Sequence, residues 1–361
     1  MLNQLNRLSK RGHRLLKIKN YAEARKIFEE ALQLSPDNVD FMIGMGDALL
    51  QQKECSAAAG YYRQVLDIDA YNTSALLGFG DVMQGLHQYS EAIESWKKYL
   101  NLKEYGDAFV LTRIADCYKT LNNQEESESF YKKALDLKAN YTYALMGLAD
   151  LYHKRGLELP ALECYEKALA NGVTLISILT IVGNLHYRQG NYELARMYYE
   201  KTLAQDPDNS YALYGLGNYY RWKYNYRRAI QLWEKILVNN SGTVNLLTRL
   251  GDAYRNLGQY EAAERAYKDS LDNGYNIFSL LGMIKLHSLR GHLKDACDCY
   301  DELLRNEKED RKVFAEIGKL FIHRNEQDLA LKFYRHALER QKDHPEVSCI
   351  IVDRIRQLEE S

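Results

Sequence analysis

The sequence predicts an all-α protein, built as a solenoid of tandem helix-turn-helix repeats. Three observations support this prediction: a repeat of about 34 residues, two apolar stripes of helical spacing in each repeat, and a turn between the stripes. A period of this length in a helical sequence is typical of stacked hairpins, in which each unit buries its apolar face against its neighbours. We therefore expect any functional site to lie on a surface of the array.

Each repeat is marked by a small residue four positions before an aromatic one. The pairs are Ala24/Phe28, Ala58/Tyr62, Ala92/Trp96, Ser127/Tyr131, Ala161/Tyr165, Ala195/Tyr199, Ala229/Trp233, Ala263/Tyr267, Ala296/Tyr300 and Ala330/Tyr334. Aligned on these pairs, the chain divides into units 5–38, 39–72, 73–106, 108–141, 142–175, 176–209, 210–243, 244–276, 277–310 and 311–344. Only 4 Pro occur and no low-complexity stretch interrupts the period, so we expect a single domain over residues 1–361.

Each unit contains two predicted helices, and positions are counted here from the first residue of the unit. Positions 4, 7, 8 and 11 are apolar or small, as in Leu213, Leu216, Gly217 and Tyr220, which is the spacing of one helix face. Positions 20, 24, 27 and 28 form the stripe of a second helix, as in Ala161, Tyr165, Ala168 and Leu169. A turn containing Gly or Asn separates the two helices, as at Gly156, Gly190, Gly258 and Gly291.

Position 8 of the first helix is almost always Gly or Ala. The residues are Gly46, Gly80, Ala115, Ala149, Gly183, Gly217, Gly251 and Gly318. Each Gly costs about 1 kcal/mol of helix propensity relative to Ala. We therefore expect the two helices of a pair to approach closely at this position, because a tight contact would offset that cost.

The segment 345–358 is predicted to be a capping helix. Pro345 suits the first turn of a helix, and Val347, Ile351, Ile355 and Leu358 form one apolar stripe. The end of a solenoid is an apolar face without a neighbour, and such a helix would cover it.

These residues resemble the tetratricopeptide repeat family over nearly the whole chain. Leu213, Gly217, Tyr220, Ala229 and Trp233 match the signature of the family, and Pro36 and Pro207 match its closing proline. The ninth unit departs from the pattern, with Ile284 and His287 where Gly or Ala and Tyr are usual. The resemblance implies antiparallel helix pairs stacked into a right-handed superhelix, with the first helices lining a concave groove.

Composition argues against several partners. The 48 Lys and Arg nearly balance the 49 Asp and Glu, and the net charge of -1 gives no field that would attract nucleic acid or a membrane. The first twenty residues contain many basic side chains and no apolar run, so we expect no signal peptide or membrane span. The six cysteines have no regular spacing, and we expect reduced thiols and a cytoplasmic location.

Signals of cofactor or catalytic chemistry are weak. Glycines such as Gly44 and Gly46 recur inside predicted helices and never complete a nucleotide-binding loop. His287, His292, Cys297 and Cys299 are the only cluster with metal-ligand chemistry, but the two cysteines point about 200° apart on a helix, whereas zinc ligands must converge. We expect no metal, no cofactor and no enzymatic activity.

The candidate binding residues lie on the face of the first helices opposite the packing stripe. Position 9 holds Asp47, Asp81, Asp116, Asp150, Asn184, Asn218 and Asp252, followed by Lys285 and Lys319. A hydrated row of polar side chains would explain this column, and so would contacts with a peptide partner. Large rings on the same face, Phe109, Tyr143, Tyr211 and Tyr214, are candidate anchors. Arg221 and Arg255 would make the later part of the groove more basic, which suits a ligand of mixed charge.

The sequence favours a non-catalytic scaffold that binds a peptide or protein segment in its groove. Position 5 contains no Lys in any unit, so the clamp with which chaperone-tail adaptors of the family hold a terminal carboxylate is absent. Two alternatives stay open: the substrate-presenting region of a larger enzyme, as in relatives with a glycosyltransferase domain, and a self-assembling adaptor or homo-oligomer.

Overall fold

The computed structural model of the chain describes residues 2–239, 243–306 and 345–360, together with Leu331, Tyr334, Arg335, Leu338 and Glu339. These residues form helices and connecting turns, and no strand occurs in the described part of the chain. The chain divides into two compact units, Met1–Thr174 and Leu175–Ser361. The tenth repeat, with Gly318 and Lys319, lies almost entirely outside the described residues.

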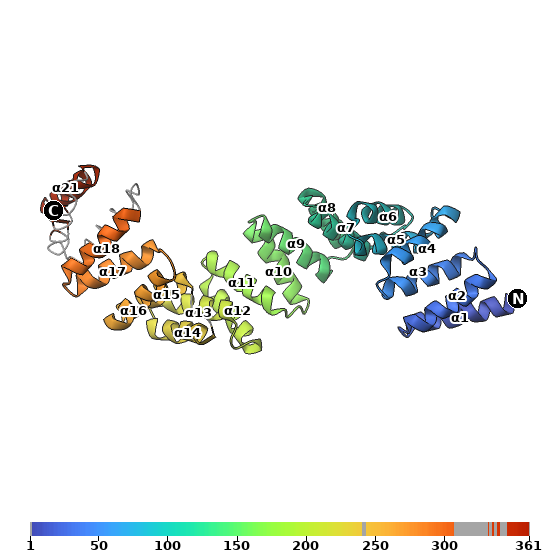
Figure 1. Cartoon of the computed structure of the whole chain (residues 1–361), viewed down its shortest axis with the longest axis horizontal. Helices are drawn as coiled ribbons and strands as arrows, with labels where there is room; N and C mark the ends of the chain where they lie inside the picture. The colour runs from blue at the N-terminus through green and yellow to red at the C-terminus, as the bar shows by residue number, and fades with distance from the viewer. Residues whose placement is uncertain are drawn as a thin grey trace. The chain divides into compact units, whose positions relative to one another are not determined.

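The first unit is a row of five helical hairpins (Figure 1). Its helices are α1 (Leu2–Lys17), α2 (Tyr21–Leu34), α3 (Val39–Gln51), α4 (Cys55–Ile68), α5 (Thr73–Gly85), α6 (Tyr89–Asn101), α7 (Ala108–Thr120), α8 (Gln124–Leu137), α9 (Thr142–Lys154) and α10 (Glu158–Ala170). Each odd-numbered helix packs against the next helix in the chain, and each of α2, α4, α6 and α8 packs against the first helix of the following hairpin.

The second unit repeats this arrangement. Its helices are α11 (Ile176–Arg188), α12 (Tyr192–Gln205), α13 (Ser210–Trp222), α14 (Tyr226–Asn239), α15 (Val244–Asn256), α16 (Tyr260–Asp272), α17 (Ile277–Leu289), α18 (Leu293–Asn306) and α21 (Pro345–Glu359). From α3 to α17, every first helix begins at the residue that opens a unit of the sequence alignment. The expected all-α solenoid of helical hairpins is confirmed, while the single domain over the whole chain stays a prediction.

The turn inside each hairpin requires a left-handed residue at position 15. Four of these residues are glycines, with φ of 72° at Gly156 and 75° at Gly258, for example. The others are Lys19, Lys53, His87, Asn122 and Tyr224, all with positive φ. A side chain with a Cβ is strained in this conformation, so the turn geometry is imposed by the packing of the two helices on either side of it.

The ring at position 24 fills the space between consecutive first helices. A Cβ on Gly46 would lie 2.8 Å from the Tyr62 ring in its own hairpin, and a Cβ on Gly78, in the next hairpin, would lie 2.4 Å from the same ring. The rings of Phe28, Tyr199 and Tyr267 occupy the same kind of slot between two glycines. The small residues at positions 6 and 8 therefore make room for a ring, which explains the tight contact expected at position 8.

Five buried tyrosines at position 24 donate their hydroxyl hydrogen bond to the residue at position 9 of the same unit. Tyr62 donates to Asp47 at 2.6 Å and Tyr165 donates to Asp150 at 2.6 Å. Tyr131, Tyr199 and Tyr267 make the same bond to Asp116, Asn184 and Asp252. A buried hydroxyl without a partner would be costly, so the polar column at position 9 satisfies the buried rings.

The last described helix, α21, contributes part of its apolar stripe to a buried cluster that also contains residues of the ninth hairpin. Ile351 and Leu358 are buried in one cluster with Leu280 and Ile284 of α17, and Tyr334 belongs to the same cluster. Ile355 packs against it, and the side chain of Val347 lies outside the described residues. The stripe of α21 is therefore buried within the second unit, and its role as a cap of the array stays a prediction.

We predict that Gly80→Ala lowers the free energy of unfolding by about 1 kcal/mol. A Cβ at this position would lie 2.2 Å from Nε1 of the buried Trp96, and overpacking costs about 1 to 3 kcal/mol against a gain of about 1 kcal/mol in helix propensity. Gly60→Ala in α4 is the matched control, because no atom lies within 4 Å of its Cβ. Urea denaturation should show Gly60→Ala to be stabilising. Equal stabilisation by both variants would contradict the packing role of the glycine.

We predict that stability falls as the pH rises above 10. Burial raises the pKa of Tyr62, Tyr131, Tyr165, Tyr199 and Tyr267 above the ordinary value of 10.0. In the unfolded chain these groups lose their protons first, so deprotonation favours unfolding in this range and has no such effect below it. Tyrosinate absorbance and circular dichroism measured together should show the buried rings ionising only as helicity is lost. Complete ionisation with helicity retained would contradict the buried hydroxyl bonds.

Candidate functional site

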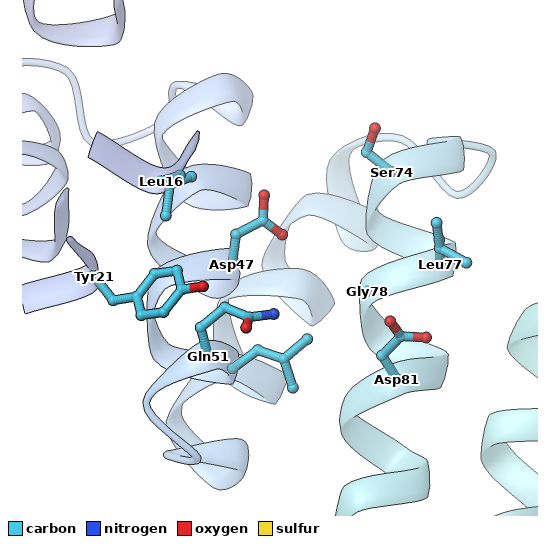
Figure 2. Close-up of a pocket in the computed structure, with 9 residues that line it drawn as sticks. Leu16, Tyr21, Asp47, Gln51, Ser74, Leu77, Gly78 and Asp81 are labelled. Carbon is cyan, nitrogen blue, oxygen red and sulfur yellow. The ribbon is translucent and has the colours of Figure 1, made fainter. Parts of the chain in front are cut away.

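Two carboxylates of position 9, those of Asp47 and Asp81, line a hollow in the first unit. The hollow has a volume of about 440 Å³. Figure 2 shows Asp47 of α3 and Asp81 of α5 projecting toward the space between these two first helices. The lining residues are Leu16, Tyr21, Asp47, Leu50, Gln51, Ser74, Leu77, Gly78 and Asp81.

The repeat places these side chains together. Asp47, Leu50 and Gln51 hold positions 9, 12 and 13 of one unit, and share a face of α3. Ser74, Leu77, Gly78 and Asp81 hold positions 2, 5, 6 and 9 of the next unit on α5. The first helices α1, α3 and α5 contact one another in this order. The hollow therefore lies on the face of the first helices that carries the candidate binding residues.

Asp81 is held by two neighbours. The Nε1 of Trp96 donates a hydrogen bond to its Oδ1 at 3.2 Å, and the guanidinium of Arg113 forms an ion pair with the same oxygen. Arg113 lies over the Trp96 ring, with 4.6 Å from its Cζ to the ring centroid, and also donates to Gln84 at 2.6 Å. The carboxylate is therefore fixed in position and its charge is partly balanced.

Asp47 has no such cation. Its hydrogen bond comes from the neutral hydroxyl of Tyr62, and it forms no ion pair within the described residues. Burial raises the pKa of the Asp47 carboxyl above its ordinary value of 3.8, and the negative charge of Asp81 raises it further, while Tyr62 and His13 oppose the shift. Nearby His13 bonds to Asp40 instead, at 2.9 Å. The hollow thus holds a partly buried carboxylate whose charge is unfavourable in the free protein.

This arrangement suits a cationic group. A cation within about 4 to 6 Å favours the charged form of a carboxyl, and Lys and Arg donate charge-assisted hydrogen bonds to carboxylates. Leu16, Leu50 and Leu77 offer apolar contacts to the aliphatic part of such a side chain. The residues of the hollow fit the end of a Lys or Arg side chain better than they fit an anion.

The other two carboxylates of position 9 in the first unit, those of Asp116 and Asp150, form hydrogen bonds within the fold. Asp116 accepts the hydrogen bond of Tyr131 and lies 3.6 Å from Nζ of Lys119. Asp150 accepts the hydrogen bond of Tyr165. Both carboxylates accept the hydrogen bond of the buried ring in their own hairpin, as Asp47 does.

In the second unit, Arg255 is part of the same internal network. Its guanidinium lies 3.2 Å from Asp252 and 3.3 Å from the hydroxyl of Tyr267, and its side chain is only 9% exposed. Asn184 accepts the hydrogen bond of Tyr199 at 2.8 Å. The charge of Arg255 is therefore balanced inside the hairpin, and we do not include Arg255 among the groups that could attract an anionic partner.

Asn218 accepts no hydrogen bond from the ring at position 24 of its unit, unlike the Asp and Asn residues of position 9 described above. The ring at position 24 of its unit is Trp233, whose Nε1 donates to the carbonyl oxygen of Tyr214 at 3.3 Å. Asn218 is only 7% exposed, and its Oδ1 has no hydrogen-bond partner. The Nε of Arg221, on the same helix, is also buried without a partner. An acceptor and a donor of α13 thus remain unsatisfied in the free protein.

The predicted aromatic anchors fall into two groups. Phe109, Tyr143 and Tyr211 are 53%, 71% and 74% exposed, so these rings are accessible, and their role as anchors stays a prediction. Tyr214 is half-buried, and its hydroxyl accepts a hydrogen bond from Nε of Arg249 at 2.6 Å. Tyr214 is therefore already engaged within its unit.

Sequence reasoning did not single out Arg113, Gln51 or Ser74 at this site. Arg113 stands at position 6, where the units on either side of it in the first unit have Gly78 and Gly147. This departure from the repeat was the available signal, because a large cation at a position normally kept small must extend toward the neighbouring hairpin. Gln51 and Ser74 lie at variable positions and gave no comparable signal.

Membrane and cysteine features add little to the site. Within the described ranges, no helix is both long and apolar enough to cross a bilayer. Cys55, Cys117, Cys164, Cys299 and Cys349 are free thiols, and the side chain of Cys297 is outside the described residues.

Comparisons with known proteins agree with the architecture. Sequence models described as tetratricopeptide repeat match residues 9–73, 110–141, 175–204 and 208–274, and so fall in both units. No curated protein sequence matches the chain.

Solved structures similar to this chain include PilF of Pseudomonas aeruginosa, at 18% identity and a TM-score of 0.51 over 58% of this chain and 95% of that one. YrrB, described as a tetratricopeptide repeat protein with an unusual peptide-binding site, has 20% identity and a TM-score of 0.44 over 52% and 95%. The Cut9–Hcn1 hetero-tetramer has 17% identity and a TM-score of 0.45 over 82% and 59%. At this level of identity a likeness concerns the fold alone. With the repeat helices, the buried rings and the matching sequence models in agreement, this chain belongs to the tetratricopeptide repeat family.

Proposed function

We propose that the chain is a non-catalytic binding protein whose first unit takes an extended segment of a protein partner. A Lys or Arg side chain of that segment would enter the hollow between Asp47 and Asp81. The main support is Asp47, a partly buried carboxylate with a raised pKa and no ion pair within the described residues. A ligand cation would relieve this unfavourable charge.

The polar residues around the hollow suit the backbone of such a segment. Gln51 and Ser74 line it beside the two carboxylates, and an amide and a hydroxyl can both donate and accept hydrogen bonds. Phe109 and Tyr143, further along the first unit, are exposed rings that a second side chain of the partner would contact. The partner would therefore combine a basic residue with an apolar or aromatic one.

In the second unit, Asn218 and Arg221 support binding of a peptide backbone. The unpartnered Oδ1 of Asn218 would accept from a backbone N–H, and the Nε of Arg221 would donate to a carbonyl or carboxylate oxygen. Tyr211 lies on the same helix and is exposed. The second unit taken by itself would therefore suit a carbonyl or carboxylate group of a partner.

The acidic residues of position 9 suit the binding of a partner better than they suit catalysis by proton transfer. Asp116, Asp150 and Asp252 each accept a hydrogen bond from a buried tyrosine, which fixes their position and occupies one oxygen. Such a carboxylate serves the packing of the fold. The cytoplasmic location expected from the sequence stays a prediction.

We predict that selection of random peptides displayed on phage will enrich sequences with Lys or Arg at one fixed position. The affinity of a selected peptide, measured by fluorescence anisotropy, should fall about tenfold or more in Asp47→Asn and in Asp81→Asn, because each variant removes one charge from a partly desolvated pair. Asn keeps an oxygen acceptor for the Tyr62 hydroxyl in Asp47→Asn and for the Trp96 ring nitrogen in Asp81→Asn. Because Asp81→Asn also breaks the ion pair with Arg113, circular dichroism should verify that both variants are folded before their affinities are compared.

Asp150→Asn is the matched control. Asp150 holds the same repeat position and accepts a hydrogen bond from Tyr165 at the same 2.6 Å distance, but it does not line the hollow. The affinity of the Asp150→Asn variant for the selected peptide should equal that of the parent chain. No enrichment of basic residues, or equal losses in all three variants, would contradict the hollow as the binding site.

A further inference from the structure

Two histidines and an aspartate meet at the turn between α17 and α18, far along the sequence from the hollow. His287 lies in the last turn of α17, His292 directly precedes α18, and Asp295 lies in the first turn of α18. One ring nitrogen of each histidine and one carboxylate oxygen of Asp295 all lie within 4.8 Å of one another. Three groups with metal-ligand chemistry therefore converge in a segment of nine residues.

The backbone holds the two histidines together. The N–H of His292 donates to the carbonyl oxygen of His287 at 2.9 Å, and Gly291 between them has φ of 75°. The two imidazole rings lie 6.3 Å apart between centroids, with an interplanar angle of 25°. This turn is fixed by the packing of α17 against α18, so the ligand positions do not depend on a flexible loop.

His287 is the buried member of the group. It is only 5% exposed, and its Nδ1 has no hydrogen-bond partner. A metal binds an unprotonated ring nitrogen of an imidazole, and the buried ring of His287 has one nitrogen without a hydrogen-bond partner.

His292 and Asp295 are half-exposed and able to adjust. Their side chains are 47% and 54% exposed, and Nδ1 of His292 lies 3.7 Å from Oδ2 of Asp295. Ligand atoms around a tetrahedral zinc ion lie roughly 3.4 Å apart, so a shift of about 1 Å by exposed side chains would complete the geometry. The open side toward solvent leaves room for a water as fourth ligand.

Three other polar side chains lie near the site but are unsuited to bind the metal: Cys299, Arg290 and Lys268. Burial raises the pKa of the Cys299 thiol to about 12, and Cys299 packs against an apolar cluster. The cations beside the site, Arg290 and Lys268, are paired with Glu264 at 3.1 Å and 2.7 Å. Cys299 is not among the groups that converge within 4.8 Å, and the nearby positive charges are balanced by a carboxylate.

We propose that His287, His292 and Asp295 bind one divalent transition-metal ion of the zinc class. Two imidazoles and one carboxylate are ligands that Zn²⁺ accepts, and three protein ligands with water in the fourth position form a complete tetrahedral shell. The ion joins the end of α17 to the start of α18. Metal binding thus braces the ninth hairpin.

The test uses the full chain, freed of any histidine tag and treated with a chelator, and titrated with zinc sulfate alone. Calorimetry should show one site, and the thermal unfolding midpoint should rise with zinc, because the ion binds only the folded turn. Cobalt chloride should give the visible spectrum of a tetrahedral site. His292→Ala and Asp295→Asn change exposed side chains and should each weaken binding about tenfold or more.

Two control variants make the result specific. His13→Ala removes another histidine that bonds to a carboxylate, Asp40, where no third ligand is found among the described residues, and binding should be unchanged. Cys299→Ser should also leave the affinity unchanged. The proposal is overturned if the parent chain binds no zinc, if His292→Ala and Asp295→Asn bind as the parent does, or if either control variant loses binding.

Discussion

The buried ring at position 24 is the constraint on which the rest of this structure depends. The ring lies between the first helices of two consecutive hairpins, so the residues that face it must be small, as Gly46 and Gly78 are around Tyr62. Its hydroxyl then needs an acceptor inside the array, which Asp47 supplies. The burial of this ring thus determines the spacing of the first helices, the small residues at positions 6 and 8, and the polar residues at position 9.

The candidate binding surface follows from groups that this packing leaves with an unbalanced charge or an unused hydrogen-bonding atom. Asp47 satisfies a neutral hydroxyl and keeps a charge that no cation in the described structure balances, whereas Asp81 is paired with Arg113. In the second unit, Trp233 bonds to a backbone carbonyl instead of position 9, and the Oδ1 of Asn218 is left without a partner. We infer that recognition uses the positions where the packing network is incomplete.

The fold could be predicted from the sequence because its periodicity reports burial directly. The paired small and aromatic residues, the helix starts from Val39 to Ile277 and the stripe of α21 all follow from which side chains must face the core. Periodicity does not report hydrogen-bond partners, so the bonds from buried tyrosines to position 9 needed coordinates. Similarly, His287 and His292 stood out in the sequence, but Asp295 did not. Asp295 joins them among the described residues because the side-chain directions depend on the turn between the helices.

The central claim is that an unbalanced carboxylate in the hollow is available to a cation. The most direct measurement is a pH titration of the Asp47 side-chain carboxyl by carbon-13 nuclear magnetic resonance, with and without a bound arginine-containing peptide. The account predicts a pKa above 3.8 in the free protein and a decrease when the peptide binds, because a nearby cation favours the charged form. A pKa below 3.8 in the free protein, or one that the peptide does not lower, would contradict it.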